Sequence, residues 1–197
     1  MIFIWGFFNL IQINGGNKMS GLTGPGIIPE KVVNYMLYAD GSRSLTALVD
    51  VDLPDIQFMS ETISGAGISG EIDSTTLGHL QAMTMGLNFR TLIDQNYHML
   101  EQRAYNLEIK AGLQSTDQNS GKIIPGKYRI MVKGYPKGFT QGKIGVGKPT
   151  DSKQEFSVNY LKVEYDGEEV LEVDKINMIF KVKGTDYLTD TRAAMGM

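Results

Sequence analysis

The sequence predicts a mainly β protein with one helix, built as one domain. Three observations lead to this prediction. Most apolar segments alternate with polar residues at the two-residue period of a half-buried strand. Two Asp-Gly pairs, at 40–41 and 166–167, stand where tight hairpin turns are expected, because both central positions of such turns need a positive φ. A helical period occurs only within residues 90–100.

Length and composition restrict the possible classes of protein. The chain has 197 residues, which is enough for one domain with a real core and short for two. Hydrophobic residues make up 42% and charged residues 21%, which is a globular composition. The formal net charge of −3 argues against non-specific nucleic-acid binding, which needs a basic excess. The sequence has no cysteine, so disulfides and cysteine zinc sites are excluded.

The N-terminal residues 1–18 are apolar but fit neither a membrane span nor a signal peptide. The run 2–13 is too short and too interrupted to cross a bilayer, and it lacks a basic start and a small-residue cleavage site. Codons for residues 15–19 can spell a purine-rich ribosome-binding site, an A-rich spacer and a start codon. We therefore expect residues 1–18 to be a translated leader and Met19 to be the true start. The alternative is a disordered arm, or one that packs against a neighbour. Residues 19–197 are expected to form a single domain.

The first two predicted strands form a hairpin. Alternate apolar residues of 32–39 share one face, and the turn at Asp40-Gly41 follows. The run 45–53 then alternates in the same way until Pro54 ends it. These two runs are expected to pair with each other across the turn.

The middle of the chain combines strands, a glycine-rich stretch and the helix. The run 56–63 is apolar on both faces, and the glycine-rich stretch 64–70 follows it. In 90–100, the residues Leu92, Ile93, Asn96, Tyr97 and Leu100 share one helical stripe. The other alternating runs of this part are 83–89, 107–113 and 128–132.

The predicted strand 154–165 changes face along its length. Apolar residues up to Tyr160 share one face, whereas those from Leu161 onward share the other. Either a β-bulge inserts an extra residue here, or the two halves of the strand are buried against different partners. The runs 170–173 and 176–182 complete a set of roughly eight strands. Strands that are apolar on both faces leave a surface in need of a partner, which indicates an assembly-forming protein.

Two glycine-rich segments resemble nucleotide-binding motifs. Residues 65–70 match G-x-G-x-x-G, but the preceding run is not a buried strand and no βαβ rhythm surrounds it. Residues 142–149 approach a P-loop, but Pro149 stands where Ser or Thr must hold magnesium. Both segments are interpreted as loops.

No other constellation predicts chemistry. An apparent calcium-loop spacing fails because Pro54 occupies a ligand position. His79 and His98 have no second ligand at metal spacing, and no G-x-S-x-G elbow is present. We therefore predict a non-enzymatic protein with no catalytic residues, cofactor or metal.

The C-terminal third carries an extended and specific pattern. Residues 156–174 read F-S-V-N-Y-L-K-V-E-Y-D-G-E-E-V-L-E-V-D, residues 175–186 read K-I-N-M-I-F-K-V-K-G-T-D, and the chain ends in R-A-A-M-G-M. This resembles the major tail tube protein family of contractile-tailed phages and phage-tail-like bacteriocins. A weaker similarity to this family covers Leu53-Pro54 and the glycines up to Gly70. Residues 90–150 are only compatible with the family pattern.

The resemblance implies two packed antiparallel sheets with one helix, forming a barrel or sandwich. It also implies hexameric rings that stack into a tube inside a contractile sheath, with strands of neighbouring subunits joined into one barrel around the channel. The expected partners are further copies of the chain, sheath, baseplate and tail terminator proteins, and DNA that passes through without specific binding. The place of action is the virion tail, or a bacteriocin particle, after assembly in the host cytoplasm. The residues expected to contact the adjacent ring are Ser64, Gly65, Gly67, Gly70, Glu71, Asp73 and Ser74.

The acidic balance suits a DNA conduit, because a wall that does not attract phosphates lets DNA slide. An alternative is the tube of a DNA-free bacteriocin, which opens a channel through the target membrane. A small nucleotide-using enzyme is disfavoured by Pro149 and by the missing βαβ units. The tube of a type VI secretion system fits the fold but not the C-terminal pattern.

Overall fold

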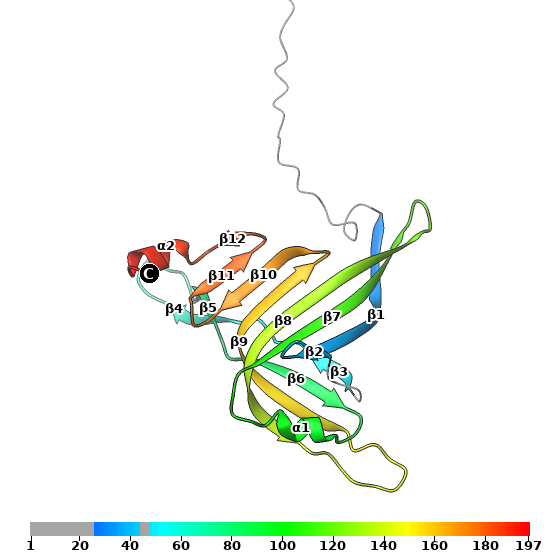
Figure 1. Cartoon of the computed structure of the whole chain (residues 1–197). Helices are drawn as coiled ribbons and strands as arrows, with labels where there is room; N and C mark the ends of the chain where they lie inside the picture. Colours follow the sequence, from blue (N-terminus) through cyan, green and yellow to red (C-terminus); the bar gives the residue numbers. More distant parts are fainter. Residues whose placement is uncertain (1–25, 44–47) are drawn as a thin grey trace, which may run out of the picture.

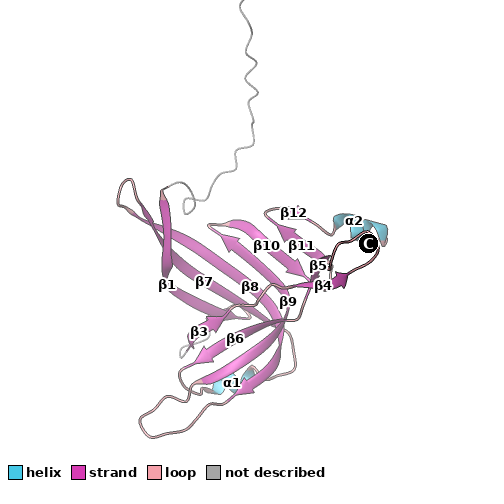
Figure 2. Ribbon diagram, turned by 180° about the vertical axis from the view of Figure 1, so that it is seen from behind, coloured by secondary structure: helices cyan, strands magenta, loops and turns pink. Residues whose placement is uncertain are grey.

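The computed structural model describes residues 26–43 and 48–197, so the leader prediction for residues 1–18 lies outside the described residues. The described part is mainly β and has two short helices (Figures 1 and 2). The strands are β1 (Ile27–Ala39), β2 (Ser42–Arg43), β3 (Leu48–Asp52), β4 (Phe58–Ile63), β5 (Ile72–Leu80), β6 (Met83–Phe89), β7 (Tyr105–Asp117), β8 (Ile123–Thr140), β9 (Ser152–Tyr165), β10 (Glu168–Asp174), β11 (Ile179–Val182) and β12 (Thr185–Asp186). The helices are α1 (Asp94–His98) and α2 (Thr189–Ala194).

The strands of residues 26–43 and 48–197 form two antiparallel sheets. The ten-stranded sheet has the order β12-β11-β10-β9-β8-β7-β1-β2, with β6 also paired to β9 and β3 paired to β6, while β4 and β5 form a separate two-stranded sheet. The mainly β prediction with antiparallel sheets is thus confirmed. The path of the large sheet ends at β12 and at β2, so a single subunit is not a closed barrel.

Strand β9 is the point at which the large sheet divides. Its first half pairs with β6, from Ser152 opposite Phe89 to Val158 opposite Met83. Its second half pairs with β10 instead, while β8 runs beside its whole length. Two strands, both antiparallel to β9, therefore pair with different halves of this long neighbour (Figure 1).

A β-bulge lies where β9 changes partner. Tyr160 is opposite Lys133 and Val158 is opposite Gly134, which leaves Asn159 as the extra residue. Burial changes parity at this point: Val158 is buried before the bulge and Leu161 after it. The first of the two predicted explanations, a β-bulge, is therefore confirmed, and residues of both halves lie in one core.

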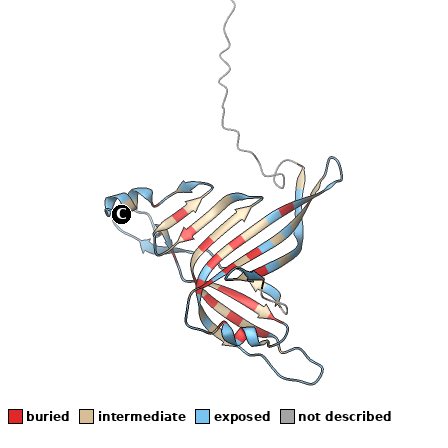
Figure 3. Cartoon of the chain, in the orientation of Figure 1, coloured by how far each residue is buried: buried red, intermediate tan, exposed pale blue. Residues whose placement is uncertain are grey.

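Most core residues lie on strands of the large sheet (Figure 3). Leu80 on β5, Met99 after α1 and Leu188 before α2 complete the core from outside this sheet. Phe156 has no exposed surface and meets Tyr105 edge to face, with ring centroids 5.8 Å apart. Burial of such aromatic side chains contributes most to the stability of a β core. The buried apolar residues are Leu37, Leu80, Met83, Met85, Leu87, Phe89, Met99, Tyr105, Leu107, Ile109, Ile130, Val132, Phe156, Val158, Leu161, Val173, Phe180 and Leu188.

Both Asp-Gly turns are confirmed by positive φ at each central residue: 49° and 78° at Asp40-Gly41, and 56° and 87° at Asp166-Gly167. The hairpin partner predicted at the first turn is wrong, however. Among the described residues, β2 continues the turn for two residue pairs, and β3 pairs with β6 rather than with β1. The alternation of 45–53 predicts a strand, but it does not identify the neighbour that buries it.

The helix found within residues 90–100, α1, is shorter than the apolar stripe that predicted it. The backbone N–H of Leu92 donates to Oγ1 of Thr150 at 3.0 Å, which ties the preceding residues to the loop before β9. The backbone N–H of Ile93 then donates to Oδ1 of buried Asn96, and α1 begins at Asp94. The second helix, α2, was not predicted, because six residues are too few for a periodic pattern.

The predicted strand 176–182 is wrong in its first part. The carboxylate of Asp174 accepts hydrogen bonds from the backbone N–H groups of Ile176, at 3.0 Å, and Asn177, at 2.9 Å. These bonds form a local turn. Met178 follows with a φ of 53°, and β11 starts only at Ile179.

Candidate assembly interface

The first candidate surface is a projecting hairpin, residues 53–80, which we call the arm. It contains β4 and β5 and is anchored at its base, where Phe58 meets Phe180 edge to face with centroids 5.5 Å apart. Gly78 lies so close to Leu188 that an added Cβ would be 2.7 Å from that side chain. The base of the arm is therefore packed against β11 and the residue that precedes α2.

The rest of the arm is exposed. Every residue of β4 is exposed, and β5 is mostly so. Two strands that bury almost nothing are not stable alone in water. An exposed apolar surface of this kind marks an interaction site. Its exposed large apolar residues are Leu53, Ile56, Phe58, Met59, Ile63, Ile68, Ile72 and Leu77.

The structure brings the predicted inter-ring residues together at the tip of the arm. Ser64, Gly65, Gly67, Gly70 and Glu71 lie in the connection between β4 and β5, and all are exposed. Gly67 and Gly70 have φ values of 93° and 124°, which side chains rarely adopt. Asp73 and Ser74 follow on β5, with Asp73 exposed and Ser74 half-buried.

The second candidate surface is the outer edge of β1. Its inner edge pairs with β7 throughout, but its outer edge meets β2 only at Tyr38 and Ala39 among the described residues. The remaining N–H and C=O groups along this edge can pair with another strand. Val32 and Val33 on this strand are 52% and 64% exposed.

The third surface is the polar face of the large sheet, which carries what we call the charge ladder. Its residues alternate along the strands with the buried core residues, so they lie on the opposite face. Four cations and four carboxylates make its net charge zero. The members are Glu108, Lys110, Arg129, Lys162, Glu164, Glu169, Glu172 and Lys181.

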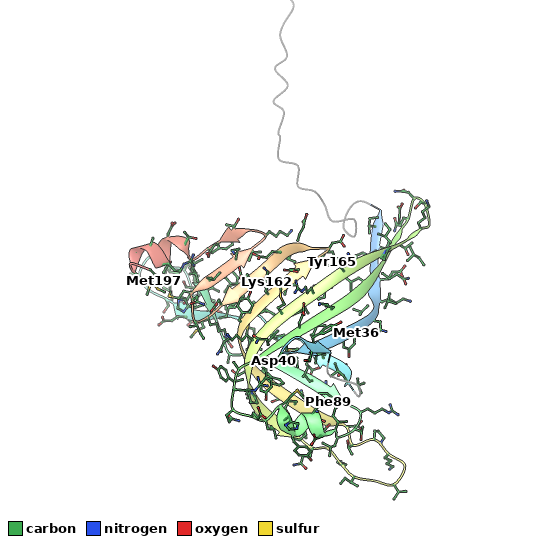
Figure 4. The ribbon with its side chains drawn as sticks, viewed as in Figure 1. Met36, Asp40, Phe89, Lys162, Tyr165 and Met197 are labelled. Atoms are coloured by element: carbon green, nitrogen blue, oxygen red, sulfur yellow. The ribbon has the colours of Figure 1, made fainter. Side chains whose placement is uncertain are left out.

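Every cation of the ladder contacts a carboxylate. Lys162, labelled in Figure 4, pairs with Glu169 at 2.8 Å and Glu164 at 3.6 Å. Arg129 lies between Glu164, at 3.2 Å, and Glu108. On the flanking strands, Lys181 pairs with Glu172 at 2.7 Å and Lys110 with Glu108 at 3.3 Å. The ladder thus runs from β7 to β11 as one network.

The two nucleotide-like motifs lack their structural context. Residues 65–70 form the arm tip, and 142–149 lie in the loop between β8 and β9, and no helix starts at either segment. Within residues 26–43 and 48–197, no three His, Asp or Glu side chains are grouped for metal binding. Neither helix of that part is long and apolar enough to span a membrane.

Comparison with known proteins identifies the family. The family model of phage tail tube protein FII matches residues 29–196. The chain belongs to the phage tail tube protein FII family. The tail tube protein of Escherichia phage P2 is 24% identical over 176 residues, which cover 86% of this chain and 99% of that protein. Among solved structures, the sheath/tube terminator of an extracellular contractile injection system, in its extended state, gives a TM-score of 0.46 at 9% identity. This match covers 69% of this chain and 96% of that one.

Membership of the tail tube family confirms the predicted resemblance and the predicted structural function in a phage tail. The family consists of structural proteins, in agreement with the predicted non-enzymatic function. The sequence did not predict the charge ladder or the open edge of β1 as functional surfaces. The alternation of Lys162 and Glu164 with apolar residues indicated one charged strand face. The complete charge ladder depends on the pairing of strands that are distant in the sequence.

Acid is expected to weaken the ladder. The hydrogen bond from Lys162 lowers the pKa of Glu169, against the opposing effect of desolvation. A carboxyl whose pKa is lowered on folding stabilises the fold above its unfolded pKa and loses this contribution as the pH falls through its folded pKa. The free energy of unfolding should therefore fall between about pH 5 and pH 3. Urea titrations should show a smaller fall for Glu169→Gln, and an equal fall would contradict this role.

Proposed function

We propose that this tail tube protein assembles into hexameric rings, which stack into a hollow tube that conducts DNA within a contractile tail. Sheath, baseplate and tail terminator proteins are its further partners. The subunit assembles in the host cytoplasm before it becomes part of the virion. The family and the curated relative are phage proteins, which favours this function over the tube of a DNA-free bacteriocin.

The observation that carries the proposal is the open large sheet. It leaves the long outer edge of β1 at one side and the short, staggered strands β10, β11 and β12 at the other. Joining the edges of neighbouring subunits around a ring satisfies their backbone groups and removes the aggregation risk of an open sheet. The half-exposed valines on β1 support this contact, because pairing would cover them.

In this arrangement the charge ladder lines the channel. The elements outside the large sheet, α1 and the arm, need room, which only the outside of a narrow cylinder offers. The four cations of the ladder are held by carboxylates. This part of the channel wall therefore attracts phosphates weakly, which lets DNA slide along it.

The arm tip forms the contact between rings. The residues assigned to this contact are Ser64, Gly65, Gly67, Gly70, Glu71, Asp73 and Ser74. All of them except half-buried Ser74 are exposed, and they lie at the end of a hairpin with little burial of its own, which supports the assignment.

Electron microscopy of the purified protein, made from Met1 and separately from Met19, tests the proposal. We expect rings and hollow tubes from the Met19 form, because residues 1–18 are expected to be dispensable. Tubes from the Met1 form alone would show that these residues belong to an interface. Monomers from both forms, at every concentration, would refute the assembly function.

A further inference from the structure

The loop between β8 and β9 exposes two apolar side chains at its end. We call residues 141–150 the tip loop. Ile144 and Val146 are 93% and 104% exposed, the highest values among the exposed large apolar residues of the described chain. A single exposed apolar residue is ordinary, but two such residues on one projecting loop form a small surface that a partner can cover.

The base of this loop is held in one conformation. Gly142 has a φ of 80° and lies so close to the backbone that an added Cβ would be 1.7 Å from the carbonyl oxygen of Thr150. The N–H of Lys143 donates to the same oxygen at 2.9 Å, and the N–H of Thr150 donates to the carbonyl of Arg90 at 3.1 Å. The loop therefore presents its apolar residues from a defined position, which lowers the entropy cost of docking.

The charges of the tip loop are opposite to those of the arm. Lys143 and Lys148 flank the two apolar residues, and the tip loop contains no acidic residue. The arm contains no lysine or arginine, and its four acidic residues form no ion pair with another described residue. These acidic residues are Asp55, Glu61, Glu71 and Asp73. Each element thus combines exposed aliphatic side chains with unpaired charge of one sign.

The two complementary elements cannot meet within one subunit. Figures 1 and 2 both show the tip loop at the bottom of the molecule, away from β4 and β5. The complement of the tip loop is therefore the arm of another copy. A contact between two different surfaces of the same chain is heterologous, and its repetition generates an open filament unless the rotation closes into a ring. Between copies in successive rings, repetition of this contact extends the tube along its axis.

We propose that the tip loop of one subunit docks on the acidic arm of a second copy in the adjacent ring. Ile144 and Val146 pack on the exposed aliphatic side chains of β4 and β5, and the two lysines pair with Glu71 and Asp73. This inference rests on the proposed tube, and it identifies the tip loop as the surface that the arm of the adjacent ring contacts. It also gives the tube a direction, because every ring presents arms at one end and tip loops at the other.

A charge-reversal experiment tests the pairing. The loop variant K143E/K148E and the arm variant E71K/D73K should each form rings but lose tubes, with roughly a tenfold loss of sedimentable tubes at low salt, because like charges now face each other. The chain that carries all four substitutions should recover tubes, because the attraction is restored with its sign inverted. Circular dichroism of the isolated subunits checks that each variant folds.

The control is Lys122→Glu, which makes the same kind of charge reversal, at half the size, in the exposed turn between β7 and β8 and should leave tubes intact. Normal tubes from the loop variant, or no recovery in the combined variant, would overturn the inference and leave the tube function standing. Loss of tubes in Lys122→Glu would overturn it as well, because net charge would then explain the result. A wild-type chain that forms neither rings nor tubes would instead refute the proposed function.

Discussion

Deletion of Asn159 is expected to abolish the native fold. This residue is the extra one in the bulge of β9, and it lets Val158 and Leu161 both point into the core. Without it, the side chains of one half of the strand move to the opposite face, because the side-chain period of a strand is two. Either Phe156 and its neighbours or Leu161 and its neighbours then face solvent, and burial of several apolar side chains is lost.

Circular dichroism and size-exclusion chromatography of the deletion variant should show an unfolded or aggregated chain. The control is deletion of Ser69 in the exposed arm tip, which shortens the chain by the same amount without entering the large sheet. This control should keep its secondary structure. A folded, monodisperse chain without Asn159 would show that the bulge does not determine which side chains are buried.

The substitution Phe156→Ala should lower the free energy of unfolding by about 3–5 kcal/mol. Its side chain has no exposed surface, and it packs edge to face on Tyr105. Truncation removes the transfer free energy of the ring and leaves a cavity that a β core cannot fully close. Urea denaturation of the isolated subunit measures this change.

The matched control is Val33→Ala on β1, where the side chain is 64% exposed. In the isolated subunit it should change the free energy of unfolding by no more than about 0.5 kcal/mol. A similar loss for both variants would mean that Phe156 is not at the centre of the core.

Local sequence patterns predicted most elements of this fold, because strand alternation and turn formation depend on residues that are close in the sequence. Alternation predicted the strands, and the two Asp-Gly pairs predicted turns whose φ values are positive. The parity change in β9 also predicted its bulge, since a face change leaves a trace in the sequence. The pairing of β3 with β6 left no such trace, because alternation does not identify the neighbouring strand. The turn at Asp174 was not predicted, because Ile176 and Met178 within it match the alternation of the following strand.

The candidate interface was predicted less completely. The glycine-rich arm tip was assigned through family resemblance, and its exposure could be known only once β4 and β5 were seen to bury so little. The charge ladder joins residues of five strands that are distant in the sequence. Residues 142–149 were interpreted only as a loop. The relation of the tip-loop lysines to the acidic arm follows from the structure, in which the two elements lie far apart (Figure 1).

A helical reconstruction of the tubes by cryo-electron microscopy tests the central claim most directly. We expect hexameric rings in which the outer edge of β1 hydrogen-bonds to the open edge of the neighbouring subunit, with Lys162 and the rest of the charge ladder facing the channel. A reconstruction in which β1 stays unpaired and the ladder faces outward would contradict this account of the tube.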